Sequence, residues 1–525
     1  MKNYIKGMAV AAMMLLALAS CRRESDTLHN YSYVDDLTWS LAQKSYGEKF
    51  KILWEGLNSN YAIWDYEKGH GLDWDEVYDK YYPKFVELDT LSTKRTIKDD
   101  ELTALLKEVV GPLHDGHMNV KLYNHMTQKF VKVSPGDERN STERKDDYYE
   151  AVVALSGVPR EPDLTYYRKT QGKLKDYKSV NATGALQIRS VMDSLSVWAN
   201  RILKATSQKT LPTEEELSDE RTAKAILSGL NQLNGFSSNE AIINAVNDLA
   251  IKYSYLNING VHELDAEMIE NGIHITYALF EGNIAYLYFD SFELTPFLTT
   301  YQTSTESLKP YARQLAAEVA DVWYSWFNAI QDLHNAGQLG GVIIDVRGNG
   351  GGMVSDYQYV LGALLPSGGQ HVMDSRTKKG VGRYDYSPLV PQVMPTYEQP
   401  HVTVTEPIAV LANIRSVSMA EMTSMGATLV ENAKLVGTRT WGGLCGLIGN
   451  EDYSFTYAGH IGVSGKTPVY VYCPCLAAFS RDGKILEGVG VTPDIEVHLD
   501  LGAWKSGNGP DSQLDRALQY ITSGK

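Results

Sequence analysis

Apolar residues recur at helical spacing in the first part of the chain. The pattern i, i+3, i+4, i+7, i+11 is occupied by Phe50, Leu53, Trp54, Leu57 and Tyr61. One face of an amphipathic helix produces this spacing. Two more helices are predicted around 74–81, with Asp73 as N-cap, and around 102–109, and an alternating strand follows at 118–122. The sequence therefore predicts a small helical domain over 39–125 that ends in a histidine-bearing turn.

Strands and helices alternate from about residue 272 onward. Continuous apolar runs predict buried strands at 284–289, 341–345, 407–412, 433–437 and 468–479. Helices are predicted over 319–336 and from about Val354 and Ser418. Such alternation predicts a layered α/β core over 272–525. The intervening residues 126–271 are predicted to form a mainly helical insertion, apart from a polar loop at 134–147.

The N-terminus has the pattern of a secretion signal. Lys2 and Lys6 precede an uncharged apolar run over 7–20, which is shorter than the ~20 residues that a membrane-spanning helix needs. The run ends in Leu18-Ala-Ser-Cys21, which resembles a bacterial lipobox. The resemblance implies that residues 1–20 are removed, that Cys21 carries lipid and that 21–38 form a tether. We expect a protein anchored to a membrane of the cell envelope; a plain signal peptide is the alternative.

The composition and the cysteine count argue against two classes of partner and cofactor for this protein, namely nucleic acid and zinc. The chain has 525 residues, of which 43% are hydrophobic and 22% charged, as in ordinary globular proteins. Its formal charge is −15, and no Lys/Arg cluster stands out, so nucleic acid is not expected as a partner. Besides Cys21 it has Cys445, Cys473 and Cys475, which predict buried free thiols or one disulfide to Cys445. Four clustered ligands are not visible, so zinc is not expected.

Ser418 is the first residue with candidate chemistry. It follows the predicted strand 407–412 and a short turn, and it begins a helix that reads Ser-Met-Ala-Glu. Serine is a common N-cap, because its hydroxyl satisfies a free N–H of the first helical turn. The same position suits a nucleophile, because the positive helix end and nearby N–H groups can stabilise an oxyanion. The local sequence leaves both interpretations open.

Three other segments could complete an active site. The turn 345–352, Asp-Val-Arg-Gly-Asn-Gly-Gly-Gly, can bind an anion but lacks the dinucleotide and P-loop spacings, so no nucleotide cofactor is expected. His117 is a candidate general base; with His114 it lacks a third ligand nearby, so no metal is expected. Glu487, in the Gly-rich segment 482–494, is a carboxylate that could orient a catalytic imidazole.

Together and in this order, four motifs resemble the tail-specific (carboxyl-terminal processing) serine proteases and, more closely, the tricorn protease core. They are Asp115-Gly-His117, Asp345-Val-Arg-Gly-Asn-Gly-Gly-Gly352, Ser418-Met-Ala-Glu421 and Glu487-Gly-Val-Gly-Val-Thr-Pro-Asp494. The resemblance implies a crotonase/ClpP-like layered α/β catalytic core and a serine peptidase without cofactor. Tail-specific proteases carry a dyad lysine where this chain has Gly443, which places it in the tricorn-like branch. That branch has a serine where this chain has Gly116. How Glu487 would interact with His117 is therefore not determined by the sequence.

The resemblance also implies a role for each residue. Ser418 would attack the peptide carbonyl, His117 would act as base, Glu487 would orient the imidazole, and the N–H groups of Gly351 and Met419 would form the oxyanion hole. A histidine base predicts an acid limb of kcat/KM between about pH 6 and 7.5. The expected substrates are peptides or unfolded protein tails. The alternative is a non-catalytic binding protein for an apolar ligand or peptide on the same fold.

Overall fold

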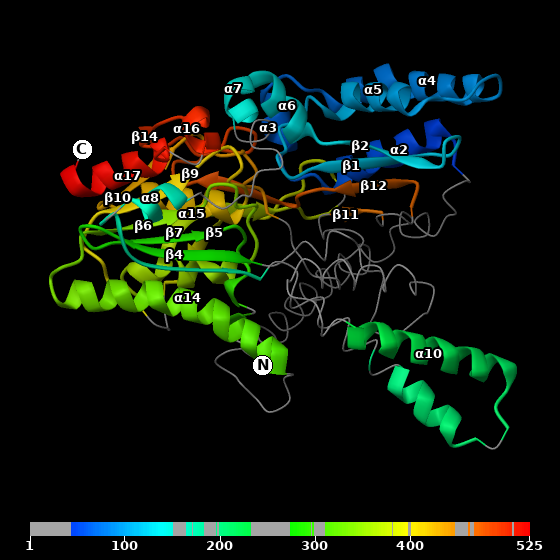
Figure 1. The fold of residues 1–525 in the computed structure, drawn as a ribbon. Helices are drawn as coiled ribbons and strands as arrows, with labels where there is room; N and C mark the ends of the chain where they lie inside the picture. The colour runs from blue at the N-terminus through cyan, green and yellow to red at the C-terminus, as the bar shows by residue number, and fades with distance from the viewer. Residues whose placement is uncertain are drawn as a thin grey trace, which may run out of the picture. The chain divides into compact units, whose positions relative to one another are not determined.

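The computed structural model describes residues 44–150, 164–182, 196–232, 273–298, 310–396, 401–446, 460–462 and 467–524, apart from short gaps at 171, 197–198, 210, 296, 381 and 507–508 (Figure 1). These residues form two compact units, which are described separately. The Ser418 unit takes its residues from Leu155–Gly369, Met394–Thr438 and Pro493–Lys525. The His117 unit takes its residues from Met1–Ala154, Gln370–Val393 and Arg439–Thr492. The units are interleaved along the chain, and the predicted linear division at 125/126 and 271/272 stays a prediction.

The Ser418 unit is organised around a seven-stranded mixed sheet. Its strands are β3 (Leu174–Asn181), β4 (His274–Phe280), β5 (Ile284–Phe289), β6 (Gly341–Asp345), β9 (Ile408–Ala412), β10 (Ala433–Gly437) and β14 (Ile495–Glu496). Their order is β14-β10-β9-β6-β5-β4-β3, with parallel pairing from β5 to β14 and antiparallel pairing among β3, β4 and β5. Every residue of β5, β6 and β9 is buried, which explains their uninterrupted apolar sequences.

Helices cover both faces of this sheet. Among the described residues the helical elements are α8 (Thr165–Lys169), α10 (Glu214–Gln232), α14 (Pro310–Asn335), η4 (Val354–Tyr359), η5 (Gly362–Leu364), α15 (Met419–Thr428), α16 (Leu501–Ser506) and α17 (Ser512–Ser523). On one face, Ile343 and Leu411 form a core with Leu514 and Ile521 of α17. Helix α14 packs on β3, β4 and β5, and Figure 1 shows it on the opposite side from α17. The predicted α/β fold class is confirmed.

The His117 unit combines helices with two small sheets. The helices that the structure describes in this unit are α2 (Tyr46–Asn60), α3 (Trp64–Gly69), α4 (Trp74–Ser92), α5 (Asp99–Val110), α6 (Pro135–Glu143) and α7 (Lys145–Tyr148). Its strands are β1 (Asn119–Asn124), β2 (Lys129–Val133), β7 (Gln370–Thr377), β8 (Val390–Met394), β11 (His460–Ile461), β12 (Val469–Tyr472) and β13 (Leu476–Ser480). The sheet orders are β11-β12-β1-β2 and β13-β7-β8. The turn that carries His117 connects α5 to β1.

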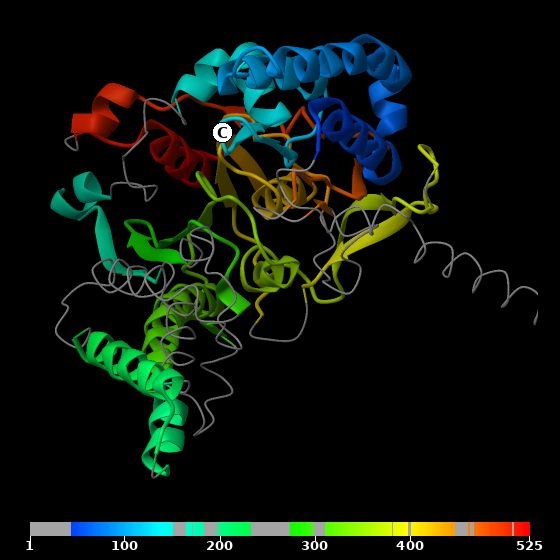
Figure 2. The ribbon, with the colours of Figure 1, turned by 90° about the vertical axis from the view of Figure 1, so that its right-hand side faces the viewer.

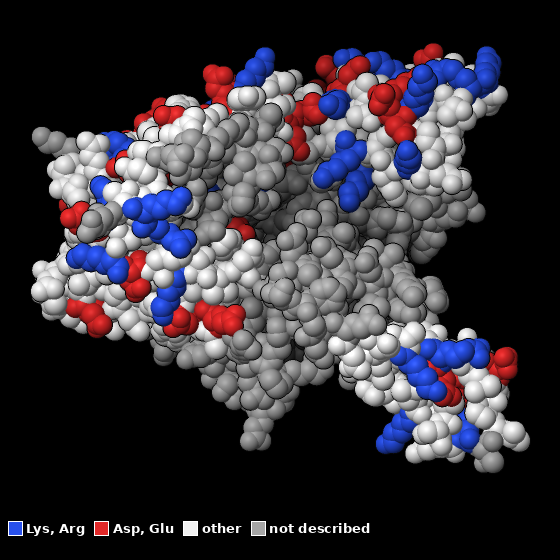
Figure 3. Space-filling model, in the orientation of Figure 1, with Lys and Arg blue, Asp and Glu red and all other residues white. Residues whose placement is uncertain are grey.

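Local sequence sets the boundaries of the N-terminal helices. Ser45 and Glu48 form a capping box at α2, and Asp73 accepts the N–H of Asp75 at 2.9 Å at the start of α4, as predicted. The predicted apolar face of α2 is buried, with Phe50 fully enclosed, and it packs on α4 (Figure 2). On the outer side of α4 and α5, basic and acidic side chains alternate (Figure 3) and form pairs such as Arg95–Glu101, at 2.7 Å.

Four local predictions differ from the structure. Residues 134–147, predicted as a loop, form most of α6 and α7, and Ser134 caps α6. The single strand predicted over 468–479 is two strands, β12 and β13, separated at Cys473-Pro474-Cys475, because proline cannot donate to a ladder. The predicted mainly helical segment 126–271 contains the strand β3, which pairs with β4. The helix predicted from Val354 is a short 3-10 helix, η4.

Candidate active site

Ser418 lies at the N-terminus of α15, just after β9 and a tight turn. It is half-buried, and its backbone has φ 57° and ψ −116°. An ordinary N-cap is extended, whereas this conformation is rare for a residue with a side chain. The Ser418 N–H donates to Glu421 Oε2 at 3.2 Å, and the preceding N–H, of Val417, donates to the Asn349 carbonyl at 3.0 Å. The chain therefore holds a strained backbone at the predicted nucleophile, which favours a functional role.

The glycine turn after β6 lies directly against Ser418. Gly351 has φ +97°, and a Cβ on it would come within 2.6 Å of the Ser418 Cβ and 3.0 Å of the Met419 nitrogen. Only glycine allows this approach. The structure thus brings together the predicted nucleophile and both predicted oxyanion donors. The Gly351 N–H donates to Asn349 Oδ1 at 2.8 Å, so an oxyanion would have to share or replace that bond.

Two buried polar residues stabilise the same turn through hydrogen bonds. Their role could not be identified from the sequence. Asn349 is fully buried, and its Nδ2 donates to the Phe289 carbonyl at 2.9 Å. Arg347 is buried and donates to Asp345 and to Asp511, the N-cap of α17, at 2.6 and 3.0 Å. These acidic partners raise the pKa of the Arg347 guanidinium well above its ordinary value, against the opposing effect of burial. The motif Asp-x-Arg-x-Asn therefore fixes the turn that carries Gly351.

His117 lies in a different unit, in the turn between α5 and β1. The residue is half-buried, and its Nδ1 atom is buried and makes no hydrogen bond. Burial lowers the pKa of His117, and the negative charge of Glu487 raises it by a smaller amount. The acid limb expected between about pH 6 and 7.5 assumed an imidazole near its ordinary pKa, whereas the loss of water around the buried ring moves the pKa of His117 downward.

Glu487 is fully buried and binds backbone amides. Its Oε1 accepts the Gly116 N–H at 2.6 Å, and its Oε2 accepts the N–H groups of Leu444 and Cys445 at 2.7 and 2.5 Å. Among the described residues no hydrogen bond joins Glu487 to His117. Glu487 therefore acts on the histidine through the turn that it holds and through its charge.

The backbone packed around Gly116 explains why this chain has glycine where the tricorn-like pattern has serine. A Cβ at this position would lie 2.3 Å from the Gly442 oxygen and 2.8 Å from the Gly443 Cα, both of them backbone atoms. The segment that carries a lysine in tail-specific proteases therefore passes directly over this turn. Its Trp441 Nε1 donates to the Gly116 carbonyl at 2.9 Å. A serine side chain does not fit here, and the amide of Gly116 contacts Glu487 in its place.

A second carboxylate in the same turn was overlooked in the sequence. Asp115 is fully buried, and its Oδ1 accepts the N–H groups of His117 and Met118 at 2.8 and 2.7 Å. On the other side of the turn, Glu67 of α3 accepts the His114 N–H at 2.8 Å and pairs with its ring. The only signal in the sequence was the position of Asp115 between His114 and His117.

Cys21 lies outside the described residues. Cys445, Cys473 and Cys475 are buried and form no disulfide, which matches the first of the two alternatives. Among the described residues, no cluster of three His, Cys, Asp or Glu is arranged to hold a metal ion, and no helix has both the length and the apolar character to cross a bilayer.

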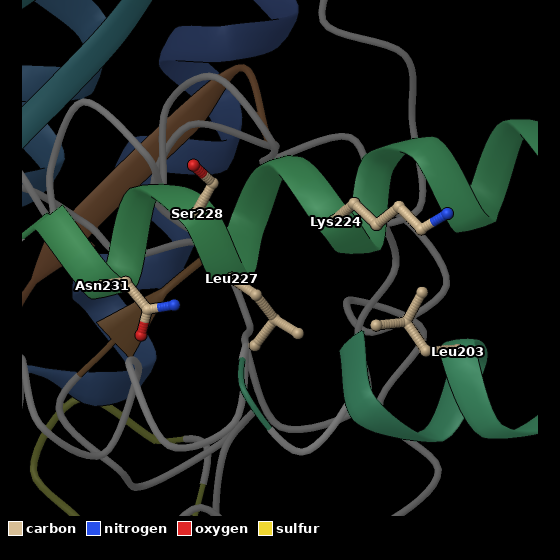
Figure 4. A pocket seen from close by; sticks show the side chains of 5 residues that line it. All are labelled: Leu203, Lys224, Leu227, Ser228 and Asn231. Atoms are coloured by element: carbon tan, nitrogen blue, oxygen red, sulfur yellow. The ribbon is translucent and has the colours of Figure 1, made fainter.

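The Ser418 unit also has a surface hollow. It has a volume of about 500 Å³ and lies between α10 and the helical residues 199–207 (Figure 4). It is lined by Leu203, Lys224, Leu227, Ser228 and Asn231. No predicted site residue is among them, and they offer no acid–base pair with a nucleophile.

Comparisons with known proteins agree with the motif pattern. Residues 283–497 match the model described as peptidase family S41. The tricorn protease of Thermoplasma acidophilum is 29% identical over 188 residues, which are 36% of this chain and 14% of that protein. This chain therefore spans only a small part of that relative.

Solved structures align over most of the chain at low identity. A crystal structure from Parabacteroides merdae has 16% identity, covers 92% of this chain and 98% of its own, and gives a TM-score of 0.46. Mature CPAF complexed with lactacystin has 13% identity, covers 92% and 98%, and gives a TM-score of 0.42.

Proposed function

We propose that this chain, a member of peptidase family S41 through residues 283–497, is a serine peptidase that hydrolyses peptides or unfolded protein tails. The observation that carries the proposal is the strained backbone of Ser418 against the glycine turn. A serine that served only as N-cap would have no need for φ 57° or for a neighbour that must be glycine.

In the proposed mechanism, Ser418 Oγ attacks the carbonyl carbon of the scissile bond and His117 accepts its proton. The N–H groups of Gly351 and Met419 stabilise the tetrahedral oxyanion, a contribution of ~10²–10³ in rate per donor. His117 then protonates the leaving amine, and water hydrolyses the acyl-enzyme by the same steps. Glu487 positions the His117 turn and stabilises the imidazolium with its charge.

A fluorophosphonate probe tests the nucleophile. The wild-type protein should be labelled and should cleave an unfolded polypeptide, and Ser418→Ala should lose both while its unfolding midpoint changes by only a few degrees. Ser416 is the matched control. Its buried hydroxyl donates to the Val346 carbonyl at 2.8 Å, so Ser416→Ala should lower stability and keep the labelling. Labelling that persists in Ser418→Ala, or a wild type that neither labels nor cleaves, would favour the binding-protein alternative.

We further propose that the protein is lipid-anchored through Cys21 in the cell envelope. The proposal rests on the short apolar run over 7–20 and the lipobox-like end of that run. Cys21→Ser should release the protein from the membrane fraction or leave the precursor uncleaved. Normal processing with membrane retention in that variant would exclude the lipid anchor.

A further inference from the structure

Two buried carboxylates share the backbone amides of the turn 115–118. Three consecutive N–H groups point at them: that of Gly116 donates to Glu487 Oε1 at 2.6 Å, and those of His117 and Met118 donate to Asp115 Oδ1 at 2.8 and 2.7 Å. Both acids are fully buried. The two side chains therefore approach the same short stretch of backbone, where two negative charges repel strongly.

The two acids are not equivalent. Glu487 uses both oxygens and accepts three N–H groups between 2.5 and 2.7 Å. Among the described residues, Asp115 accepts only through Oδ1, and its buried Oδ2 atom has no hydrogen-bond partner. A buried anionic oxygen without a donor costs far more free energy than a neutral carboxyl group. The single negative charge that this site tolerates is therefore best placed on Glu487.

We propose that Asp115 is a positioning residue that holds the His117 turn as a neutral carboxylic acid, so that the pair Asp115–Glu487 carries one negative charge, located on Glu487. The positioning role rests on the proposed function, because it presumes that His117 is the base. The protonation state does not depend on that function.

The surroundings of Asp115 support the neutral form. Glu487 and Glu67 act on it electrostatically, and Asp115 in turn acts on four titratable groups of neighbouring segments: Tyr61, Tyr472, Cys445 and Cys473. Each of these is an acid, and His117 is adjacent in the turn. Two cations lie near these groups: Arg139 of α6 directs Nη1 to the Leu113 carbonyl at 2.9 Å, and buried Lys378 interacts electrostatically with Cys473. Burial first, and then the charge of Glu487, raises the pKa of Asp115 well above its ordinary value, although the two amides lower it.

A neutral Asp115 has a consequence for the histidine. It fixes the backbone of His117 through the N–H bond without adding a second negative charge beside the ring. Among the described residues, the charge of Glu487 raises the pKa of His117, and burial outweighs it. The imidazole therefore stays neutral, as a general base must be, over a wider pH range than it would beside two carboxylates.

The matched variants Asp115→Asn and Asp115→Ala test the positioning role. The asparagine amide is neutral and nearly isosteric, and its oxygen can accept the same two N–H bonds, whereas alanine removes both. Asp115→Asn should keep kcat within about threefold of wild type, and Asp115→Ala should lose at least about tenfold in kcat with KM little changed, because the base is displaced. An asparagine variant that is as impaired as the alanine variant, or that does not fold, would overturn the proposal.

Proton counting tests the charge state without any need for activity. If folded Asp115 is protonated, unfolding at about pH 6 releases one proton from it, because an unfolded aspartate has a pKa of about 3.9. The unfolding free energy of the wild type, measured by urea titration at several pH values, should therefore fall with rising pH more steeply than that of Asp115→Asn, by one proton per molecule. Equal slopes would mean that folded Asp115 is ionised, and the proposal would fail.

The two experiments separate this inference from the proposed function. A wild type that neither cleaves polypeptide nor reacts with the fluorophosphonate probe would end the assignment of His117 as base. The proton count would still decide the state of the acid pair. Conversely, active wild-type enzyme with equal pH slopes would leave the peptidase intact and refute the neutral Asp115.

Discussion

Replacing Glu487 with glutamine tests how this buried acid serves the histidine turn. The carboxylate accepts three N–H groups at 2.5–2.7 Å, and a glutamine can accept only with its carbonyl oxygen. If that oxygen keeps the bonds from Leu444 and Cys445, the amide NH₂ faces the Gly116 N–H and that bond is lost. A hydrogen bond to a charged group contributes ~1.5–3 kcal/mol and a neutral one ~0.5–1.5 kcal/mol. Losing one bond and weakening two, partly offset by removing a buried charge, predicts a destabilisation of about 2–4 kcal/mol.

The same change should shift the pH dependence of hydrolysis. The Glu487 charge raises the pKa of His117 against the effect of burial, so its removal lowers that pKa further. A base works when it is deprotonated, so the acid limb of kcat/KM should move to lower pH in Glu487→Gln. In the wild type, the limb should already lie below the ordinary histidine value of ~6.5.

Urea unfolding at about pH 7 and a pH–rate profile measure the two effects. Glu108→Gln is the control, because this glutamate is 52% exposed and pairs with Lys84 at the surface. It should cost no more than ~1 kcal/mol and leave the profile unchanged. A Glu487→Gln variant as stable as the control, or an acid limb that stays in place or moves upward, would refute the role derived for Glu487.

Three further predictions concern residues of the two turns. His117→Ala should lower kcat about as much as Ser418→Ala does, because members of one catalytic unit are not additive; near-normal turnover would exclude His117 as base. Gly351→Ala places a methyl group 2.6 Å from the Ser418 Cβ and should reduce both labelling and stability, and equal probe reactivity would argue against the close approach. Gly116→Ser should destabilise by about 1–3 kcal/mol in urea unfolding, because the side chain meets backbone. Gly69→Ser, with open space around the position, is its control and should cost little.

The central strands could be predicted from the sequence because each of them is a run of consecutive, mostly apolar residues. Residues 284–289 and 341–345 form strands with the predicted bounds, and 407–412 differs by one residue. A strand covered on both faces needs apolar side chains at every position, and few other local structures have this requirement. The order of the strands, by contrast, depends on contacts between distant segments, and β3 was missed because its exposed edge position leaves it polar.

The polar segment 134–147 shows why composition misled the local prediction. Its arginines are buried: Arg139 donates to the Leu113 carbonyl, and Arg144 donates to the carbonyls of Arg439 and Thr440, both at 2.5 Å. The helices α6 and α7 are thus held by charged side chains that bind backbone carbonyls of another segment. No periodic apolar pattern results from such packing, so the segment looks like a solvated loop.

The sequence motifs located the chemical groups but could not assign their partners. From the sequence, the Asp-x-Arg-x-Asn turn is interpreted as an anion-binding loop. In the structure, Arg347 and Asn349 are buried and stabilise the turn through hydrogen bonds within one unit. Asp115 appeared only as part of a histidine motif, although it holds the backbone of His117. Side-chain identity within a motif does not say which residues face substrate and which bind backbone, because that depends on burial.

The contact between Gly116 and Glu487 limits what the carboxylate can do in the proposed mechanism. A serine hydroxyl, present in the tricorn-like pattern, can accept one proton while donating another. A backbone amide only donates, and it does not lose its proton at ordinary pH. The bond from Gly116 N–H to Glu487 therefore cannot pass a proton toward His117. Glu487 is left with two means of action, which are the geometry of the turn and the charge that stabilises the imidazolium.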